Sequence, residues 1–294
     1  MFALRKIDMR VVFDTNALSN ESFDLLESSP LRILCRKGRI APVYGHVFIE
    51  ETLRTYGAER RRADLVTRRL PFLADTATFI CNDFQEIWHS ELVQGRGVNA
   101  RIFMVERKRE RLVSAWRNVP PDGSWRAWHA SADAREEEER KRAAQRQTSQ
   151  EIRNEITTWK QNVNYDPKWH GAPDLRRYIE ANLIYGGKQF IPALVQCHNP
   201  VEVAERWARA PDSYPFFTTF VKNMLYIAYH AATMPNSIDL NAQADMDVMT
   251  HLLHADVLVS NEKRFMRTAF NDLWRPKRKV IFTSAEFANY LRKL

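Results

Sequence analysis

Acidic side chains fall into four clusters along the chain, and each cluster lies where a predicted strand meets a loop or a helix. The clusters are Asp14, Glu50 with Glu51, Asp245 with Asp247, and Glu262. A few converging carboxylates can hold Mg²⁺, which prefers hard oxygen ligands, and still leave room for a phosphate and an attacking water. If the clusters meet in space, they predict a site that hydrolyses phosphodiester bonds with one such ion, or with two roughly 4 Å apart.

Neutral polar residues adjoin the first and the last cluster. Thr15 and Asn16 follow Asp14, and Ser260 and Asn261 precede Glu262. Their hydroxyl and amide groups could orient the carboxylates or position a water molecule, as residues around metal ligands commonly do.

Each acid taken alone also has a structural interpretation. Asp14 could cap the helix after its strand, as could either acid of the third cluster. Acids in the first turn of a helix interact favourably with its dipole, which is the structural interpretation of the second cluster. Glu262 could be an exposed turn residue. The joint occurrence favours catalysis, while the choice of ligand within each pair, Glu50 or Glu51 and Asp245 or Asp247, stays open.

The elements that must position these acids alternate between strands and helices. The predicted strands are 9–13, 39–43, 76–81, 256–260 and 279–283. Helices are predicted between them, and this alternation is typical of parallel βαβ units. We therefore expect an α/β fold in which the acids meet at the carboxyl ends of the strands, where open α/β sheets bind their ligands.

The middle of the chain shows no clear strand, and its composition suits helices. We therefore expect two parts. Residues 1–82 and 240–294 would form a discontinuous α/β core, and residues 83–239 would form a mainly helical insertion or cap.

The order of these short segments resembles the PIN-domain ribonucleases. The first strand ends in Asp14-Thr15-Asn16, and an acid lies early in the helix after the Pro42-Val43 strand. The run from Asp247 through Ala255-Asp256-Val257-Leu258-Val259-Ser260-Asn261-Glu262 to Phe265 is similar to the closing part of that family. The segment from Val280 to Phe287 is similar to its last strand and helix. The resemblance covers residues 9 to 58 and 240 to 294.

The resemblance implies a three-layer α/β/α fold with a central parallel sheet, and cleavage of single-stranded RNA with Mg²⁺ or Mn²⁺. Asp14 would be the central metal ligand, Glu51 or Glu50 the second acid, and Asp247 the third, with Asp245 as its competitor. Glu262 would take the fourth position, where the family more often has Asp. The resemblance also implies a role in a toxin-antitoxin pair or in RNA turnover, with an antitoxin or a second copy of the chain as partner.

The charge of the chain suits a polyanionic partner. Lys and Arg number 44 against 36 acids, a formal charge of +8, which attracts RNA or DNA over long range. Candidate phosphate contacts lie in one basic stretch and comprise Arg60, Arg61, Arg62, Arg68 and Arg69.

The sequence carries no signal for export or for a membrane. Charged residues interrupt the apolar residues of the first thirteen positions, and no apolar run approaches the length that spans a bilayer. The three cysteines are far apart and fit neither a disulfide framework nor a thiolate metal site. We therefore expect a cytoplasmic protein without a membrane partner.

Two other functions fit parts of the pattern. A flap-type DNA nuclease also uses clustered acids, and it would cut branched DNA instead of RNA. A catalytically silent module that binds nucleic acid or protein through its helical part would retain binding without cleavage. His251 and His254 follow Asp247 at spacings of four and seven residues, but without further ligands they are better interpreted as core or surface histidines than as a zinc site.

Overall fold

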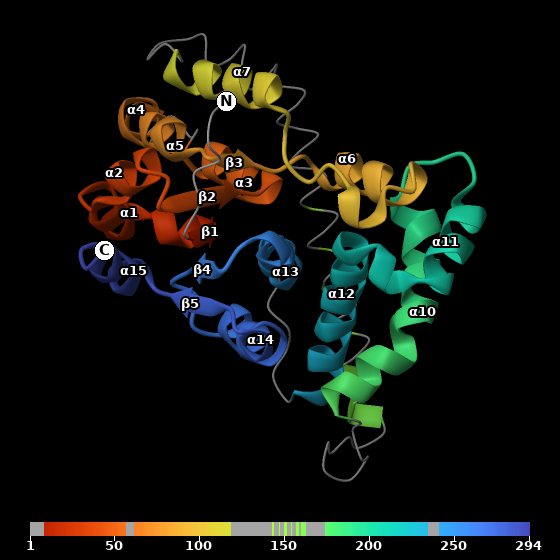
Figure 1. The fold of residues 1–294 in the computed structure, drawn as a ribbon. Coiled ribbons are helices and arrows are strands. Elements are labelled where there is room, and N and C mark those ends of the chain that lie inside the picture. Colours follow the sequence, from red (N-terminus) through yellow and green to blue (C-terminus); the bar gives the residue numbers. More distant parts are fainter. Residues whose placement is uncertain are drawn as a thin grey trace.

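A five-stranded parallel sheet forms the centre of the computed structural model (Figure 1). The structure describes residues 9–56, 62–118, 174–234 and 241–294, with a few positions between 143 and 162. The strands are β1 (Met9–Phe13), β2 (Ile40–Tyr44), β3 (Phe79–Ile80), β4 (Val257–Val259) and β5 (Val280–Phe282). Their order is β3-β2-β1-β4-β5, and every pair is parallel.

Strand β1 lies in the middle of this sheet, so its end has neighbours on both sides. Val12 pairs with Val43 of β2 and with Leu258 of β4. The first and last parts of the chain therefore form one sheet. Polar residues that follow β1, β2, β3, β4 and β5 all emerge at its carboxyl edge.

Helices make up most of the rest of the described chain. The first half contains α1 (Asn20–Glu27), α2 (Leu31–Arg36), α3 (His46–Tyr56), α4 (Arg62–Asp64), α5 (Leu70–Thr76), α6 (Phe84–Trp88) and α7 (Glu106–Arg117). The second half contains α10 (Leu175–Leu194), α11 (Pro200–Arg209), α12 (Pro215–Thr233), α13 (Ala242–Thr250), α14 (Phe265–Leu273) and α15 (Ser284–Leu291). Short 3₁₀ turns include η1 (Thr15–Leu18) and η7 (His251–His254), and η3 (Leu65–Arg69) and η4 (His89–Val93) are π-helical turns.

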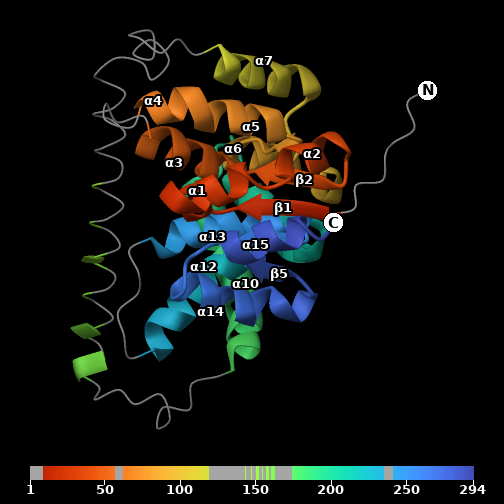
Figure 2. The same cartoon turned by 90° about the vertical axis from the view of Figure 1, so that its left-hand side faces the viewer.

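Alternate residues of the strands pack into two separate hydrophobic clusters because successive side chains of a strand point to opposite faces. Val11 and Phe13 join one cluster, which includes residues of α1, α2 and α15. Val12 joins the other, which includes residues of α12, α13 and α14. Figures 1 and 2 show these two groups of helices on opposite sides of the sheet, with α7 outside α5.

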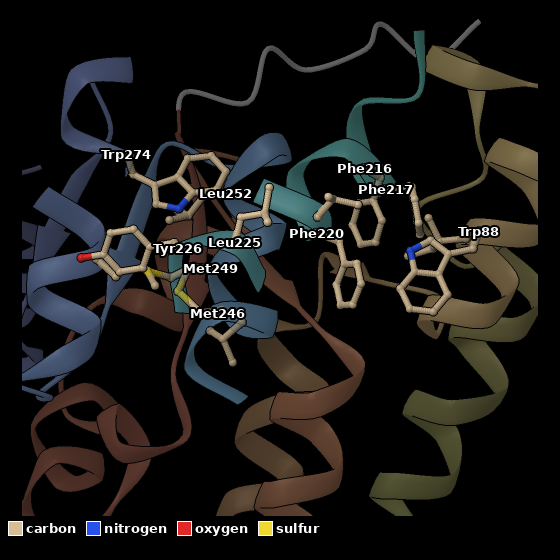
Figure 3. Packing of buried hydrophobic residues seen from close by; sticks show 14 of the residues in the cluster. Trp88, Phe216, Phe217, Phe220, Leu225, Tyr226, Met246, Met249, Leu252 and Trp274 are labelled. Atoms are coloured by element: carbon tan, nitrogen blue, oxygen red, sulfur yellow. The ribbon is translucent and has the colours of Figure 1, made fainter. Parts of the chain in front are cut away.

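The second of these clusters continues into the helical middle of the chain. Trp88 packs against Phe217 and Phe220 of α12, with ring centroids 5.8 and 4.9 Å apart. Figure 3 shows this aromatic group in line with Met246 and Met249 of α13, so α12 joins the middle helices to the sheet. Burial of large aromatic side chains stabilises such a contact strongly.

The α/β prediction is confirmed, with small shifts of the strands. Ile40–Tyr44 begins one residue later than predicted, and only Phe79–Ile80 of the predicted strand 76–81 is a strand. Thr76 is instead the last residue of α5, where its hydroxyl donates to Phe72 O at 2.7 Å.

The described part of residues 83–239 is helical apart from loops and one isolated antiparallel bridge between Cys81 and Phe103. The division into a core and an insertion stays a prediction. Among the described helices, none is both long enough and apolar enough to cross a membrane.

Candidate active site at the carboxyl edge of the sheet

Asp14 lies at the carboxyl end of the central strand and is 6% exposed. Its backbone N–H donates to Val259 O at 3.0 Å, which holds the end of β1 beside β4. Asp14 occupies the N-cap position of the turn that follows, but its side chain makes no capping hydrogen bond to that turn. Instead Ser260 Oγ donates to Asp14 Oδ2 at 2.8 Å. Burial raises the pKa of Asp14 to about 6, although the Ser260 bond opposes this shift.

Glu51 projects from α3 toward Asp14, while Glu50 turns away. Thr15 Oγ1 donates to Glu51 Oε2 at 2.6 Å, and the charge of Glu51 contributes to the raised pKa of Asp14. Glu50 is 55% exposed and pairs with His46, whose Nε2 lies 3.0 Å from its Oε1. Both acids lie past the first turn of α3, so a first-turn dipole role is wrong for them.

Asp247 extends from α13 into the same region. Its Oδ1 is buried and has no hydrogen-bond partner, and burial followed by the charge of Glu51 raises its pKa to about 8. Asp245 lies in the first turn of α13, two residues earlier, which turns it about 200° around the helix from Asp247. The structure therefore brings Asp14, Glu51 and Asp247 into one electrostatically coupled group, with Glu51 acting on both of the others.

The carboxylate of Glu262 is hydrogen-bonded to backbone N–H groups at the start of α14. Its Oε1 accepts a bond from the backbone N–H of Arg264 at 2.7 Å, and its Oε2 accepts one from Arg267 at 3.4 Å. An acid that satisfies free N–H groups at a helix start stabilises that helix. The carboxylate of Glu262 therefore has a structural role here, and its role as a fourth ligand stays a prediction.

Neutral side chains hold the ends of β1, β4 and β5 together. Asn16 Oδ1 accepts a bond from the backbone N–H of Asn261 at 2.8 Å. Asn261 Nδ2 donates to Ser22 Oγ and Ser284 Oγ at 2.9 and 3.0 Å, and its Oδ1 accepts from Ser284 N at 2.9 Å. These bonds join the loops around Asp14, and the predicted role of Asn16 and Asn261 in orienting ligands or positioning water stays a prediction.

The two histidines beyond Asp247 lie among aromatic rings, with His251 buried and His254 half-buried. His251 lies 5.7 Å from the rings of both Phe84 and Phe216, and burial lowers its pKa to about 3. Burial likewise lowers the pKa of His254 to about 4. Both are therefore neutral near pH 7, and the burial of His251 fits the interpretation of that residue as a core histidine.

The donor types of the coupled group fit Mg²⁺ or Mn²⁺. Carboxylate oxygens are the ligands these ions prefer, and the unpaired Oδ1 of Asp247 offers one such atom with no competing partner. In the part of the chain that the structure describes, no three Asp, Glu, His or Cys side chains are arranged so as to enclose a metal ion. Metal binding would therefore require the side chains of Asp14, Glu51 and Asp247 to draw closer.

In the described part of the basic stretch, Arg68 and Arg69 are paired with acids of the same chain. Arg68 forms ion pairs with Asp24, Glu27 and Asp64. Arg69 is 3% exposed, pairs with Asp64 and donates to Leu18 O. The pairs of Arg68 with Asp24 and Glu27 hold η3 against α1, and the pairs with Asp64 join η3 to α4. Arg60, Arg61 and the side chain of Arg62 lie outside the described residues.

Sequence reasoning missed the polar residues that follow β2 and β3. His46 begins α3, and Gly45 before it passes so close to His251 that a Cβ would lie 2.5 Å from the ring. Asn82 follows the bridge residue Cys81, and its Nδ2 donates to Arg101 O at 3.0 Å. The signal resembled the one that identified Asp14, namely a polar residue within two positions of the end of an apolar strand.

Comparison of the chain with protein-family models, with curated protein sequences and with solved structures found no match.

Proposed function

We propose that this protein is a metal-dependent endoribonuclease of the PIN-like class. In this proposal the sheet and its two groups of helices form the three-layer α/β/α core, and residues 83–239 form a helical insertion. The observation that carries the proposal is the coupled group of Asp14, Glu51 and Asp247, which comes from three elements at the carboxyl edge of a parallel sheet.

Ionised carboxylates destabilise a fold when they are buried without a cation, so two buried acids at one edge of the sheet indicate a functional role. Burial raises the pKa values of Asp14 and Asp247, which means that the ionised forms are disfavoured in the folded chain. Perturbed acids that lie together at a ligand-binding edge are typical of catalytic sites. A divalent cation would remove this cost by pairing with the ionised forms.

Asp14, Glu51 and Asp247 would hold Mg²⁺ or Mn²⁺, and the ion would supply Lewis-acid stabilisation of the charge that develops on the phosphate. Ser260 favours the ionised form of Asp14 by donating to Oδ2. Thr15 orients Glu51 through its 2.6 Å bond to Oε2. Asp247, whose pKa burial raises to about 8 in the absence of an ion, would lose its proton when it holds the ion.

RNA is the proposed substrate because the chain is basic and because it resembles the PIN-domain ribonucleases. The net charge of +8 favours a polyanion over a neutral substrate. A role in RNA turnover or beside an antitoxin, and pairing with a second copy, rest on the resemblance alone.

Cleavage of a labelled single-stranded RNA pool tests the proposal. Wild-type protein should cut in Mg²⁺ or Mn²⁺ and not in EDTA, and Asp14→Asn should remove the cutting while its circular dichroism spectrum stays that of the wild type. Glu50→Gln is the matched control, because Glu50 pairs with His46 and should be dispensable. Metal-independent cutting, or full activity of Asp14→Asn, would refute the mechanism.

A catalytically silent binding module is the alternative. Two observations favour it. Among the described residues, no three side chains are arranged to enclose a metal ion, and Glu262 accepts a hydrogen bond at the start of α14. Retained RNA binding without cutting in any divalent ion would support it. Cleavage of branched DNA but not of RNA would instead support the flap-type nuclease.

A further inference from the structure

An open cavity of about 440 Å³ lies beside β3, outside the coupled acids. Its volume falls within the range of about 300 to 1,000 Å³ that small-ligand sites occupy. Four segments build its wall: α6 with the π-helical turn η4, the loop before α7, α7 itself, and the loop after α10. π-helical turns are rare and occur frequently at functional sites.

One wall of the cavity lies near the carboxyl edge that carries Asp14. Asn82 lines it and directly follows Cys81, whose backbone N–H donates to Tyr44 O at the end of β2. Lys108 also lines it, and its charge acts on the pKa of His46, the first residue of the helix that carries Glu51. Since β3 lies two strands from β1, the cavity begins about 10 Å from the end of the central strand.

Among the Lys and Arg residues that line the cavity, Lys108 is paired with an acid and Arg101 is paired with none that the structure describes. Lys108 Nζ lies 2.7 Å from both carboxylate oxygens of Glu86, so these two charges compensate each other. The Arg101 guanidinium is exposed and makes no hydrogen bond or ion pair with any described residue. A guanidinium in this state suits a phosphate, which it can bind with two parallel hydrogen bonds.

The neutral lining suits the base of a nucleotide. The side-chain amides of Gln94 and Gln196 have no hydrogen-bond partner within the ranges that the structure describes. Side-chain amides can pair with the donor and acceptor edge of a base. Val105 is 60% exposed at the wall and offers an apolar surface to a ring.

We propose that this cavity is a nucleotide subsite that binds one unit of single-stranded RNA next to the bond that is cut, with Arg101 on the phosphate and Gln94 and Gln196 on the base. This inference rests on the proposed function, which supplies RNA as the substrate and the cut bond as the neighbouring position. The binding step itself needs neither metal nor cleavage.

Binding of a fluorescein-labelled single-stranded RNA in EDTA, read as anisotropy in an Asp14→Asn background, tests the phosphate contact. Arg101→Ala should weaken binding about tenfold and reduce the salt slope of log K by about one, as expected for one lost phosphate contact. Arg96→Ala is the matched control, because Arg96 is also exposed and removes the same charge but does not line the cavity. It should weaken binding less than about twofold, through the long-range field alone.

Binding of homopolymeric RNAs tests the base contact. Gln94→Ala with Gln196→Ala should change the relative affinities for the four homopolymers and leave the salt slope unchanged, because the variant keeps every charge. Nucleoside monophosphates should compete with the RNA in the Arg96→Ala protein and compete less in the Arg101→Ala protein.

Equal weakening by Arg96→Ala and Arg101→Ala would overturn the subsite, and so would competition by mononucleotides that Arg101→Ala does not change. Thermal unfolding checks that all variants are folded. If wild-type protein never cuts RNA but Arg101→Ala selectively loses binding, the cavity stands as a nucleotide-binding site and the nuclease proposal fails. If wild-type protein cuts and the two arginine variants bind alike, the nuclease stands and the subsite fails.

Discussion

Thr15 Oγ1 and Glu51 Oε2 are joined by a hydrogen bond of 2.6 Å, which connects the turn after the central strand to the helix after β2. This bond selects Glu51 over its neighbour Glu50. A helix turns by about 100° per residue, so only one of two adjacent acids can face the sheet edge. Glu51 faces it and places its negative charge near both Asp14 and Asp247.

Replacing Glu51 with Gln should lower the pKa values of both Asp14 and Asp247, because a like charge beside each acid disfavours its ionised form. NMR titration of the carboxyl carbons measures both values. Glu50→Gln should leave them unchanged and should keep RNA cleavage, whereas Glu51→Gln should lose cleavage. An equal effect of the two variants on the titrations would contradict the selection of Glu51.

Replacing Ser260 with Ala should raise the pKa of Asp14 above its value of about 6, because the lost bond favours the ionised carboxylate. The acid limb of the pH profile for cleavage should therefore move to higher pH, with a larger loss at pH 6 than at pH 8. Ser260→Thr, which keeps the hydroxyl, should restore the profile. A loss that is uniform with pH would indicate a structural effect of Ser260 alone.

Asn261 should be important for stability because its side chain joins three segments. It contacts Asn16 O, Ser22 Oγ and both backbone and side chain of Ser284. Asn261→Ala leaves partly buried polar groups without partners and should lower the free energy of unfolding by about 1 to 3 kcal/mol, measured with urea. Asn289→Ala, at an exposed position of α15, is the control and should have little effect.

The sequence was sufficient to predict the approximate places of the strands, and Asp14 at the end of the first one. Short apolar segments bounded by Asp14 or Ser260 are strong local signals, and the parallel order of the strands then brings their ends to one edge. The local pattern could not decide between Glu50 and Glu51, because that choice depends on which face of α3 packs on the sheet.

The contacts that depend on distant residues were not accessible from local patterns. Arg68 and Arg69 read as free basic charges, yet acids of α1 and α4 pair with them. The cavity beside β3 is built by side chains as far apart as Asn82 and Gln196, so no short motif reports it. Burial of Glu91, which accepts the backbone N–H groups of Phe216 and Phe217 at 2.8 Å, likewise follows from the packing of η4 on α12.

Glu262→Gln separates a helix-start role from a metal role. Gln retains one acceptor for the backbone N–H groups at the start of α14, so the free energy of unfolding should fall by no more than about 1 kcal/mol. If the carboxylate only stabilises this helix start, RNA cleavage and its Mg²⁺ dependence should stay near those of the wild type. A loss of activity that excess Mn²⁺ partly restores would instead support the fourth-ligand prediction.

Stability should depend on pH through several groups with shifted pKa values. The raised pKa values of Asp14 (about 6), Glu91 (about 7) and Asp247 (about 8) mean that the folded chain binds these protons more tightly than the unfolded chain. The contribution of each acid to the free energy of unfolding is therefore lost as pH rises from about 4 to the pKa of that acid in the folded chain. His251 and His254, with lowered pKa values of about 3 and 4, act in the opposite direction below about pH 6.5.

Above about pH 6.5 the histidine contributions are complete, so Asp247 should cause stability to decline further toward pH 8. Asp247→Asn should remove this part of the decline, and its advantage over wild type should grow by on the order of 2 kcal/mol between pH 6.5 and pH 8. Urea unfolding at each pH in EDTA measures the difference.

Mg²⁺ or Mn²⁺ should stabilise the wild type more at pH 8 than at pH 6, because the ion must displace a proton from Asp247 and Asp14 at the lower pH. Asp247→Asn should lose most of that added stabilisation, while Glu50→Gln should keep it. Equal stabilisation of all three proteins by the ion at pH 8 would place the metal elsewhere on the chain, since a ligand stabilises a fold only through the sites it occupies.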